Sequence, residues 1–241
     1  MVYTYDGSFD GFLTCVYESY YNKWPDNITC HEKYIVSFVD EEKYIVANKE
    51  KANKVKKSIK DKLSHTTYKI IYTVFLSSCD NKEKNLLNYI GLLFKYGNSI
   101  NYHKQNPTII YVDKIYARVK KEAHRFTGFV RFKDIQGVLY SKIEPDNNIL
   151  ELIASHFKDR FSNEKFIIHD AIRERAIIYD GSSLRISEDF NINVEIKIDD
   201  VYESLWRGYF KATNIKEREN LKHQRGMMPK RYWSNLTEVE K

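Results

Sequence analysis

The chain has 241 residues, of which 42% are hydrophobic and 30% are charged, and its formal net charge is +6. That composition is typical of a globular protein with a substantial core, and it excludes a disordered or collagen-like chain. Because no apolar run approaches the roughly 18 residues of a membrane span and no basic leader opens the sequence, we expect a cytoplasmic protein that does not bind a membrane.

The first half of the sequence predicts mainly helices. Val2–Tyr5 alternates like a short strand, and Asp6-Gly7 then turns the chain into a helix for which Ser8 is the N-cap. The β-branched runs between residues 34 and 47 have no clear type. The helices predicted in this half cover residues 8–21, 49–63, 66–78, 81–97 and 107–126.

The second half predicts strands and a few helices. The predicted strands cover residues 128–132, 138–143, 166–169, 176–179 and 183–186, and the predicted helices cover residues 149–161 and 199–212. These elements predict an α+β fold, in which a helix-rich N-terminal half packs on a largely antiparallel sheet with flanking helices in the C-terminal half. No Gly- or Pro-rich linker divides the chain. We therefore expect a single compact domain over 1–241, either undivided or built of two lobes, 1–105 and 106–241.

The distribution of cations draws attention to the second half. Every arginine lies from Arg118 onward, and a guanidinium offers a planar fork for phosphate or carboxylate and stacks on rings. Positive charge concentrates over 118–134, with six Lys or Arg against two acids, and over 207–231, with eight against two. Such runs permit nucleic-acid binding, although a solvated face remains the simpler interpretation of each.

A series of motifs resembles one bacterial family. The motifs are Tyr5-Asp6-Gly7-Ser8-Phe9, the runs 122–132, 143–146 and 156–161, His169-Asp170 with Arg173, the runs 205–210 and 215–220, and Gln224 with the run 228–233. In order and spacing they resemble proteins that are assigned to DNA metabolism or DNA repair and encoded beside a radical-SAM protein. Some members are fused to a uracil-DNA-glycosylase-like domain, which this sequence does not include. The resemblance covers nearly the whole chain and is weakest over 24–104.

This resemblance implies a role in DNA metabolism, with DNA and the radical-SAM DNA modification or repair protein as partners. The iron–sulfur cluster and SAM would belong to that partner, and we expect no cofactor in this chain. The resemblance brings no established catalytic residue with it.

Cations and rings in the second half are the candidates for contact with DNA. The candidate phosphate contacts are Arg125, Arg131, Arg160, Arg173, Arg207, Lys211, Arg218 and Arg231. The candidate rings, for stacking on bases or docking on a partner, are Phe129, Trp206, Tyr209, Tyr232 and Trp233. On a strand over 128–132, Phe129 and Arg131 would share one side. Core packing for the rings and local ion pairs for Arg131 and Arg173 remain open, and the stretch 226–233 is expected to dock on its own domain or on a partner.

Three residues are candidate acid–base groups for an enzyme that processes nucleic acid by a glycosylase-like or hydrolytic reaction: His124, His156 and Asp170. No P-loop, dinucleotide-binding, serine-hydrolase or radical-SAM motif occurs. The three scattered cysteines and the spacing of the histidines predict no metal site. A DNA-binding accessory protein, such an enzyme and a protein-interaction scaffold therefore remain as alternative functions.

Overall fold

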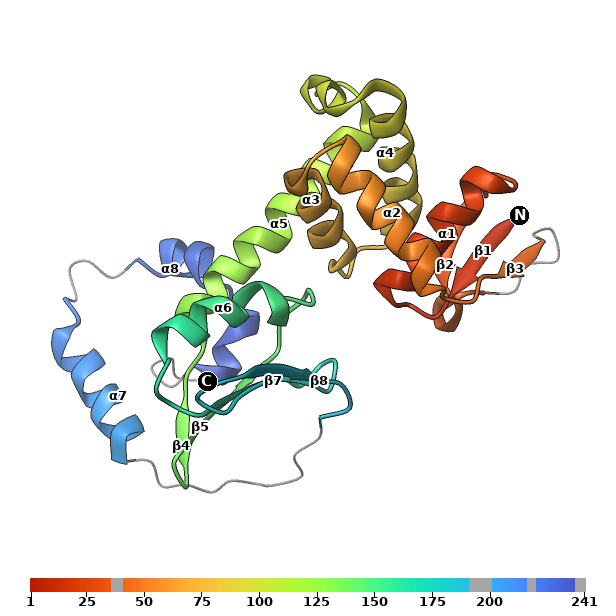
Figure 1. The fold of residues 1–241 in the computed structure, drawn as a ribbon. Helices are drawn as coiled ribbons and strands as arrows, with labels where there is room; N and C mark the ends of the chain where they lie inside the picture. The colour runs from red at the N-terminus through yellow and green to blue at the C-terminus, as the bar shows by residue number, and fades with distance from the viewer. Residues whose placement is uncertain (36–40, 191–200, 216–219, 237–241) are drawn as a thin grey trace. The chain divides into compact units, whose positions relative to one another are not determined.

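The computed structural model of the chain describes residues 1–35, 41–190, 201–215 and 220–236. The chain divides into two compact units, Met1–Lys120 and Lys121–Lys241. The division falls inside the helix α5 (Pro107–Phe129), downstream of residue 105, where the sequence suggested a limit between lobes. Each unit contains a sheet and several helices (Figure 1), so the predicted α+β class is confirmed.

Unit 1, Met1–Lys120, contains a parallel sheet of three strands in the order β2-β1-β3. The central strand β1 (Val2–Tyr5) is buried along its whole length, and it pairs with β2 (Asn27–Cys30) and β3 (Glu42–Tyr44). The strand β1 was predicted. The strand β2 was not predicted, because its four residues begin at the last residue of the Pro25-Asp26-Asn27 break and show too little alternation to identify a strand.

The helices of unit 1 follow the predicted periodicity closely. They are α1 (Phe9–Tyr21), α2 (Lys49–Lys62), α3 (His65–Phe75), α4 (Lys82–Tyr96) and the first part of α5, with the short 3₁₀ turns η1 (His31–Lys33) and η2 (Asn98–Tyr102). Ser8 caps α1, since its Oγ accepts a hydrogen bond of 2.9 Å from the backbone N–H of Gly11. Rings fill the core between α1 and α3, where the centroids of Phe9 and Phe75 lie 4.9 Å apart.

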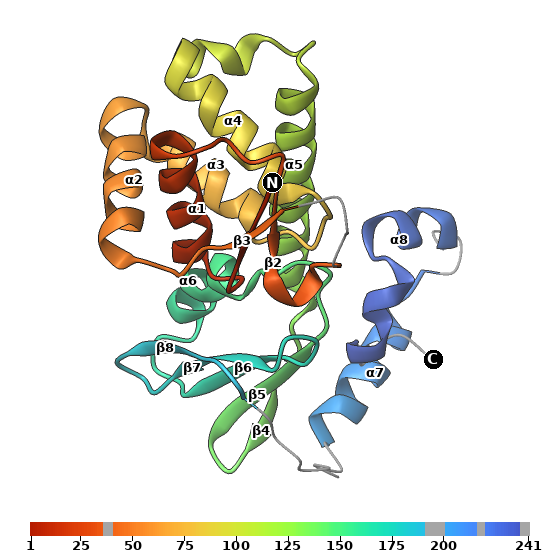
Figure 2. The same cartoon turned by 90° about the vertical axis from the view of Figure 1, so that its right-hand side faces the viewer.

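Unit 2, Lys121–Lys241, is built on a sheet of five strands in the order β4-β5-β6-β7-β8. The strands are β4 (Lys133–Ile135), β5 (Val138–Ile143), β6 (Phe166–Asp170), β7 (Arg175–Tyr179) and β8 (Leu184–Ser187). Only β5 and β6 pair in parallel, so the expectation of a largely antiparallel sheet is confirmed. Helix α6 (Leu150–Arg160) covers one face of the sheet (Figures 1 and 2), and its Phe157 joins a cluster of rings with Phe132 and Phe166.

The prediction of a strand over 128–132 is wrong. Helix α5 continues to Phe129, and the backbone N–H of Val130 still donates to the carbonyl of Phe126 at 3.3 Å. Apolar positions in this segment alternate like a strand but also recur three apart, and burial of Phe126 decides in favour of the helix. Phe129 and Arg131 therefore do not share a strand face.

The C-terminal part of unit 2 contributes helices α7 (Val201–Thr213) and α8 (Leu221–Met227) and the 3₁₀ turn η4 (Lys230–Asn235). The helix predicted over 199–212 corresponds to α7, and its first two residues lie outside the described part of the chain. Among the residues that are described, no helix combines the length and the apolar character that crossing a membrane requires.

Candidate functional site

The carboxylate of Glu122 organises a buried polar network in unit 2. Glu122 lies near the end of α5, and the loop between β5 and α6 wraps around it. The backbone N–H groups of Asp146 and Asn147 donate to its two oxygens at 2.8 and 3.0 Å, and the side-chain amide of Asn147 donates as well. Burying a carboxylate costs free energy unless such donors compensate it, so the loop conformation and the buried acid depend on each other.

The fourth donor to Glu122 comes from the far end of the chain. The hydroxyl of Tyr232, in η4, donates to Glu122 Oε1 at 2.5 Å, and the ring packs edge-on against Phe126 at 5.0 Å. Burial, followed by the hydrogen bond to Glu122, raises the pKa of Tyr232 above its usual range. The hydroxyl therefore remains a donor at neutral pH.

Arg231 reinforces this attachment from the solvent side. Its Nη2 lies 2.8 Å from Asp146 Oδ2 and donates to the Tyr232 hydroxyl at 3.1 Å, and its guanidinium lies over the Tyr232 ring at 4.8 Å. Arg231 and Tyr232 together with Glu122 and Asp146 are called the latch below. Because the latch occupies both residues, Tyr232 faces the interior of unit 2, and Arg231 is paired with a carboxylate.

Further hydrogen bonds hold the stretch before the latch. Arg125 Nη2 donates to the carbonyl of Gly226 at 2.7 Å, and Trp233 Nε1 donates to the carbonyl of Met228 at 2.9 Å. The stretch 226–233 thus docks on its own unit, which was one of the two expected arrangements. Trp233 is partly buried, and the ammonium of Lys230 lies 5.8 Å from its ring.

Asp170 and Arg173 form the local ion pair that the sequence left open. Asp170 is fully buried, and its Oδ2 lies 3.0 Å from Arg173 Nη1. The same guanidinium donates to the carbonyls of Pro145 and Asp146, at 3.0 and 2.5 Å. Arg173 therefore joins the turn after β6 to the loop around Glu122, and its charge is neutralised internally.

The candidate acid–base groups are not joined to one another. His124 is exposed on α5, His156 is exposed on α6 beside the ring of Phe157, and Asp170 is buried in its ion pair. No hydrogen bond or ion pair connects them in the part of the chain that is described, and no group of metal-ligand side chains gathers there.

A histidine that sequence reasoning did not single out as acid–base, His169, is buried at the end of β6. Its Nδ1 lies 2.9 Å from the hydroxyl of Tyr140. Burial, and then the charge of Lys142, lowers the pKa of His169. Its place at the end of a strand in the motif His169-Asp170 was the available signal, but burial could not be inferred from it.

The remaining candidate cations differ in exposure. Arg131 donates to the carbonyls of Gly128 and Val130 at 2.6 and 3.2 Å, so the helix end occupies it. Arg160 is exposed, with its guanidinium 5.7 Å from the Phe161 ring, and Arg207 is exposed on α7. Lys211 lies on α7, but its side chain, like all of Arg218, falls outside the described residues.

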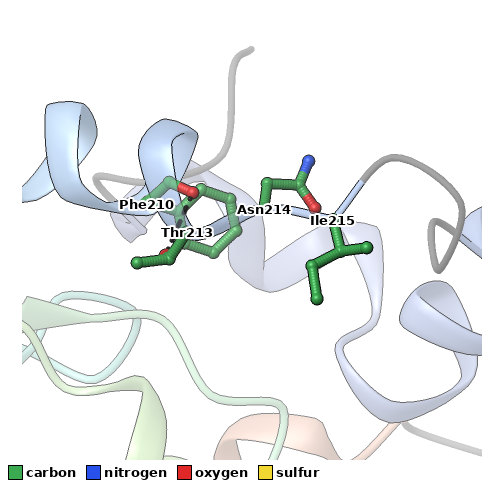
Figure 3. A pocket seen from close by; sticks show the side chains of 4 residues that line it. All are labelled: Phe210, Thr213, Asn214 and Ile215. Atoms are coloured by element: carbon green, nitrogen blue, oxygen red, sulfur yellow. Dashed lines mark hydrogen bonds between the residues drawn. The ribbon is translucent and has the colours of Figure 1, made fainter.

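Helix α7 presents large apolar side chains to solvent. The exposed fractions are 63% for Leu205, 42% for Trp206, 60% for Tyr209 and 39% for Phe210. Their spacing places them on one face of the helix, called the α7 face below, and the rings of Trp206 and Tyr209 stack at 5.8 Å with an interplanar angle of 29°. Figure 3 shows a pocket at the C-terminal end of this helix, lined by Phe210, Thr213, Asn214 and Ile215. Exposed apolar faces of this kind are common at interaction sites, so the α7 face is a candidate.

Comparison with known proteins places the chain in a family. No curated protein matches it. Among solved structures, it is similar to the pGpG-specific phosphodiesterase PggH from Vibrio cholerae, at 10% identity and a TM-score of 0.34, over 80% of this chain and 84% of that one. A likeness at that TM-score is no evidence of a shared activity. The sequence model of a domain of unknown function (DUF4130) matches residues 80–238, more than half of the chain and nearly all of unit 2, and the chain therefore belongs to the DUF4130 family.

Proposed function

We propose that the protein acts in DNA metabolism as a DNA-binding accessory of a radical-SAM partner, and that unit 2 contacts the DNA. The observation that carries this proposal is the α7 face, where the exposed rings of Trp206 and Tyr209 stack on each other, and Arg207 is exposed on another face of the same helix. Unpaired bases stack on such rings, with a gain of about 1–3 kcal/mol for each base. The DNA and radical-SAM parts of the proposal come from the motifs that resemble the DNA-metabolism family.

The structure sorts the candidate phosphate contacts by availability. Arg173 and Arg231 are neutralised by Asp170 and Asp146, so they add little to a positive surface. Arg160 is exposed, and no carboxylate pairs with it in the described ranges. On the exposure of these side chains, we assign the phosphate contacts chiefly to Arg160 and Arg207, and the stacking contacts to Trp206 and Tyr209.

The test is DNA binding measured by fluorescence anisotropy with a labelled single strand and a labelled duplex, at low and at physiological salt. The double variant Trp206→Ala/Tyr209→Ala should weaken single-strand binding by about tenfold or more, because it removes both stacking rings. Tyr102→Ala removes a ring that is 85% exposed in unit 1 and serves as the control. A wild-type protein without DNA affinity, or a double variant that binds like the control, contradicts the proposal.

The cations are tested in the same assay. Arg160→Ala and Arg207→Ala should each reduce the salt dependence of binding, by about 0.7 in the logarithmic slope for each single-strand phosphate that the variant no longer neutralises. Lys62→Ala, at an exposed position of α2, is the matched control. A slope that does not change in either arginine variant argues against phosphate binding at these positions.

A second candidate function is a scaffold that docks on the radical-SAM protein through α7. The exposed Leu205 and Phe210 favour it, because aliphatic and phenyl side chains suit a protein interface. The double variant Trp206→Ala/Tyr209→Ala would then abolish co-purification with the radical-SAM partner, while DNA binding remains unchanged. The acid–base hypothesis for His124, His156 and Asp170 gains no support from their separate environments.

A further inference from the structure

We propose that unit 1 carries a second contact for single-stranded nucleic acid, on the surface where helices α1 and α2 meet. The surface consists of Tyr17, Tyr21, Lys51 and Lys54 and is called the tyrosine platform below. A base stacks on Tyr21, and Lys54 neutralises a phosphate beside it. The inference rests on the proposed function and deepens it, because it adds a site in Met1–Lys120, where sequence reasoning placed no candidate.

Two stacked rings form the centre of the platform. Tyr17 and Tyr21 lie four positions apart on α1, and their ring centroids lie 4.3 Å apart at an interplanar angle of 23°. Tyr21 is 72% exposed. Because Tyr17 covers one face of the Tyr21 ring, the exposed area belongs mostly to the opposite face and the edge. A base that stacks there extends an existing stack on a ring that is already held, which limits the entropic cost of binding.

The packing of α2 on α1 sets where the cations of the platform lie. The two helices pack side by side within unit 1 (Figures 1 and 2). At the start of α2, the backbone N–H of Asn48 donates to the buried Thr14 Oγ1 at 3.0 Å. One turn further, Lys51 Nζ lies 2.5 Å from Glu18 Oε1. The first turns of α2 are therefore held next to the last turns of α1, where the two rings lie.

The two lysines of the platform differ in the charge that they offer. Their ammonium groups lie 5.6 Å (Lys51) and 6.0 Å (Lys54) from the centroid of the Tyr17 ring. Lys51 is neutralised by Glu18. Lys54 is exposed, and no carboxylate pairs with it in the part of the chain that the structure describes. Lys54 is therefore the cation that is available to a phosphate next to the stacked rings.

The charge of α2 favours a nucleic acid as the occupant. Its 14 residues include seven lysines and two acids, so the surface beside the rings is positive and attracts a polyanion. The bases of a duplex stack on one another and offer no free face to Tyr21, whereas unpaired bases can stack on the ring. The platform should therefore bind a single strand in preference to a duplex.

The first experiment maps the contact by photocrosslinking. The full chain is irradiated with a single strand in which iododeoxyuridine replaces thymidine, since this base crosslinks to aromatic side chains on which it stacks. Trypsin releases residues 1–23 as one peptide, separate from the peptides within 198–211 that carry the α7 face. We expect crosslinks in the peptide 1–23, and we expect Tyr21→Ala to remove them. Crosslinks confined to 198–211 would overturn the inference and leave the proposed function standing.

Tyr96→Ala is the matched control for the ring. Tyr96, on α4 of unit 1, is 52% exposed, and the ammonium of Lys95 lies 5.0 Å from its ring. It thus has an exposed ring with a cation nearby, but among the described residues no second ring stacks on it. This variant should keep the crosslinks in the peptide 1–23 and the affinity of the wild type.

The second experiment separates base stacking from a general loss of structure. In the anisotropy assay, Tyr21→Ala should weaken single-strand binding by about fivefold or more and leave duplex binding unchanged, because only unpaired bases reach the ring. Lys54→Ala should reduce the logarithmic salt slope by about 0.7, the contribution of one single-strand phosphate. Lys62→Ala is the matched control for the charge, since Lys62 is exposed on the same helix, about 12 Å along its axis from Lys54.

The remaining outcomes each have one meaning. If Tyr21→Ala weakens single-strand and duplex binding equally, or weakens neither, the inference is wrong. If Tyr21→Ala instead abolishes co-purification with the radical-SAM partner while DNA binding stays unchanged, the platform contacts a protein and the inference is again wrong. Failure of the proposed function is a different result, in which the wild-type chain binds no DNA or Trp206→Ala/Tyr209→Ala binds like its control.

Discussion

Glu122 is a buried acid of unit 2, and four donors converge on its carboxylate. Glu122→Gln should lower the free energy of unfolding by about 2–4 kcal/mol. The glutamine NH2 group replaces one accepting oxygen, so it faces other donors and leaves them without an acceptor. Urea unfolding measures the change. Glu164→Gln, at an exposed loop position, should cost almost nothing, and equal losses in the two variants would contradict the buried role of Glu122.

His169 gives unit 2 a dependence on acid pH. Burial and the charge of Lys142 lower its pKa in the folded state, and the nearby Asp170 and Glu174 oppose this without reversing it. Because the folded pKa lies below the usual 6.5, the contribution of His169 to the free energy of unfolding is fully present above pH 6.5. This contribution is lost as the pH falls through the folded value. His169→Gln should flatten unfolding free energy against pH in that window. Titration of the His169 ring by NMR at or above 6.5 would contradict this sign.

Two glycines test how unit 2 is divided into elements. Gly137 has φ +83° in the hairpin turn between β4 and β5, and Gly128 lies in helix α5, and a Cβ added at either position would meet nothing within 4 Å. Backbone conformation alone therefore decides the sign. Gly137→Ala should destabilise the protein by about 1 kcal/mol, whereas Gly128→Ala should stabilise it by about 0.5–1 kcal/mol.

Thermal or urea unfolding of the two glycine variants gives the comparison directly. Glycine in the middle of a helix or of a strand is less stable than alanine, whereas glycine at a positive φ is more stable than alanine. Shifts of the same sign in the two variants would therefore contradict either the helical conformation of Gly128 or the positive φ of Gly137.

Elements with local signals could be predicted from the sequence, and elements without them could not. Ser8 and Asn48 cap α1 and α2 with side-chain hydrogen bonds, and these helices begin where the sequence placed them. The strand over 128–132 failed because a short apolar run satisfies both periods, and only tertiary burial of Phe126 decides between them. β2 was missed because its pairing with β1 is a long-range interaction.

At the scale of the whole molecule, the latch could not be predicted from the sequence, although the motifs described above contain its residues. Glu122, Asp146 and Tyr232 all lie in the motifs that carry the family resemblance, yet Glu122 and Tyr232 are 110 positions apart. Sequence reasoning assigned arginines to phosphates because it could not see which carboxylates neutralise them. The exposure of Trp206 and Tyr209 could not be predicted from the sequence either, because rings that recur along one side of a helix usually pack in the core.

Both units contain tyrosines whose hydroxyls are protected from ionisation, and this predicts the alkaline limit of the molecule. Burial, followed by the charge of Asp113, raises the pKa of Tyr89 in unit 1 from 10.0 to about 12, and burial with Glu122 raises that of Tyr232 in unit 2. Because the folded pKa of each tyrosine lies above the unfolded value, its contribution to the free energy of unfolding is fully present below pH 10.0. This contribution is lost as the pH rises through the folded value.

We therefore expect the free energy of unfolding to decrease steeply above pH 10, with tyrosinate absorbance appearing together with unfolding for these buried rings. Tyr89→Phe should make the alkaline loss shallower for unit 1, and Tyr232→Phe should do so for unit 2, because each removes one protected proton. Tyr21, which is 72% exposed, provides the control: Tyr21→Phe should leave the alkaline profile unchanged. A profile that Tyr89→Phe and Tyr232→Phe do not alter would show that these hydroxyls ionise in the folded state, and it would place the loss of stability elsewhere.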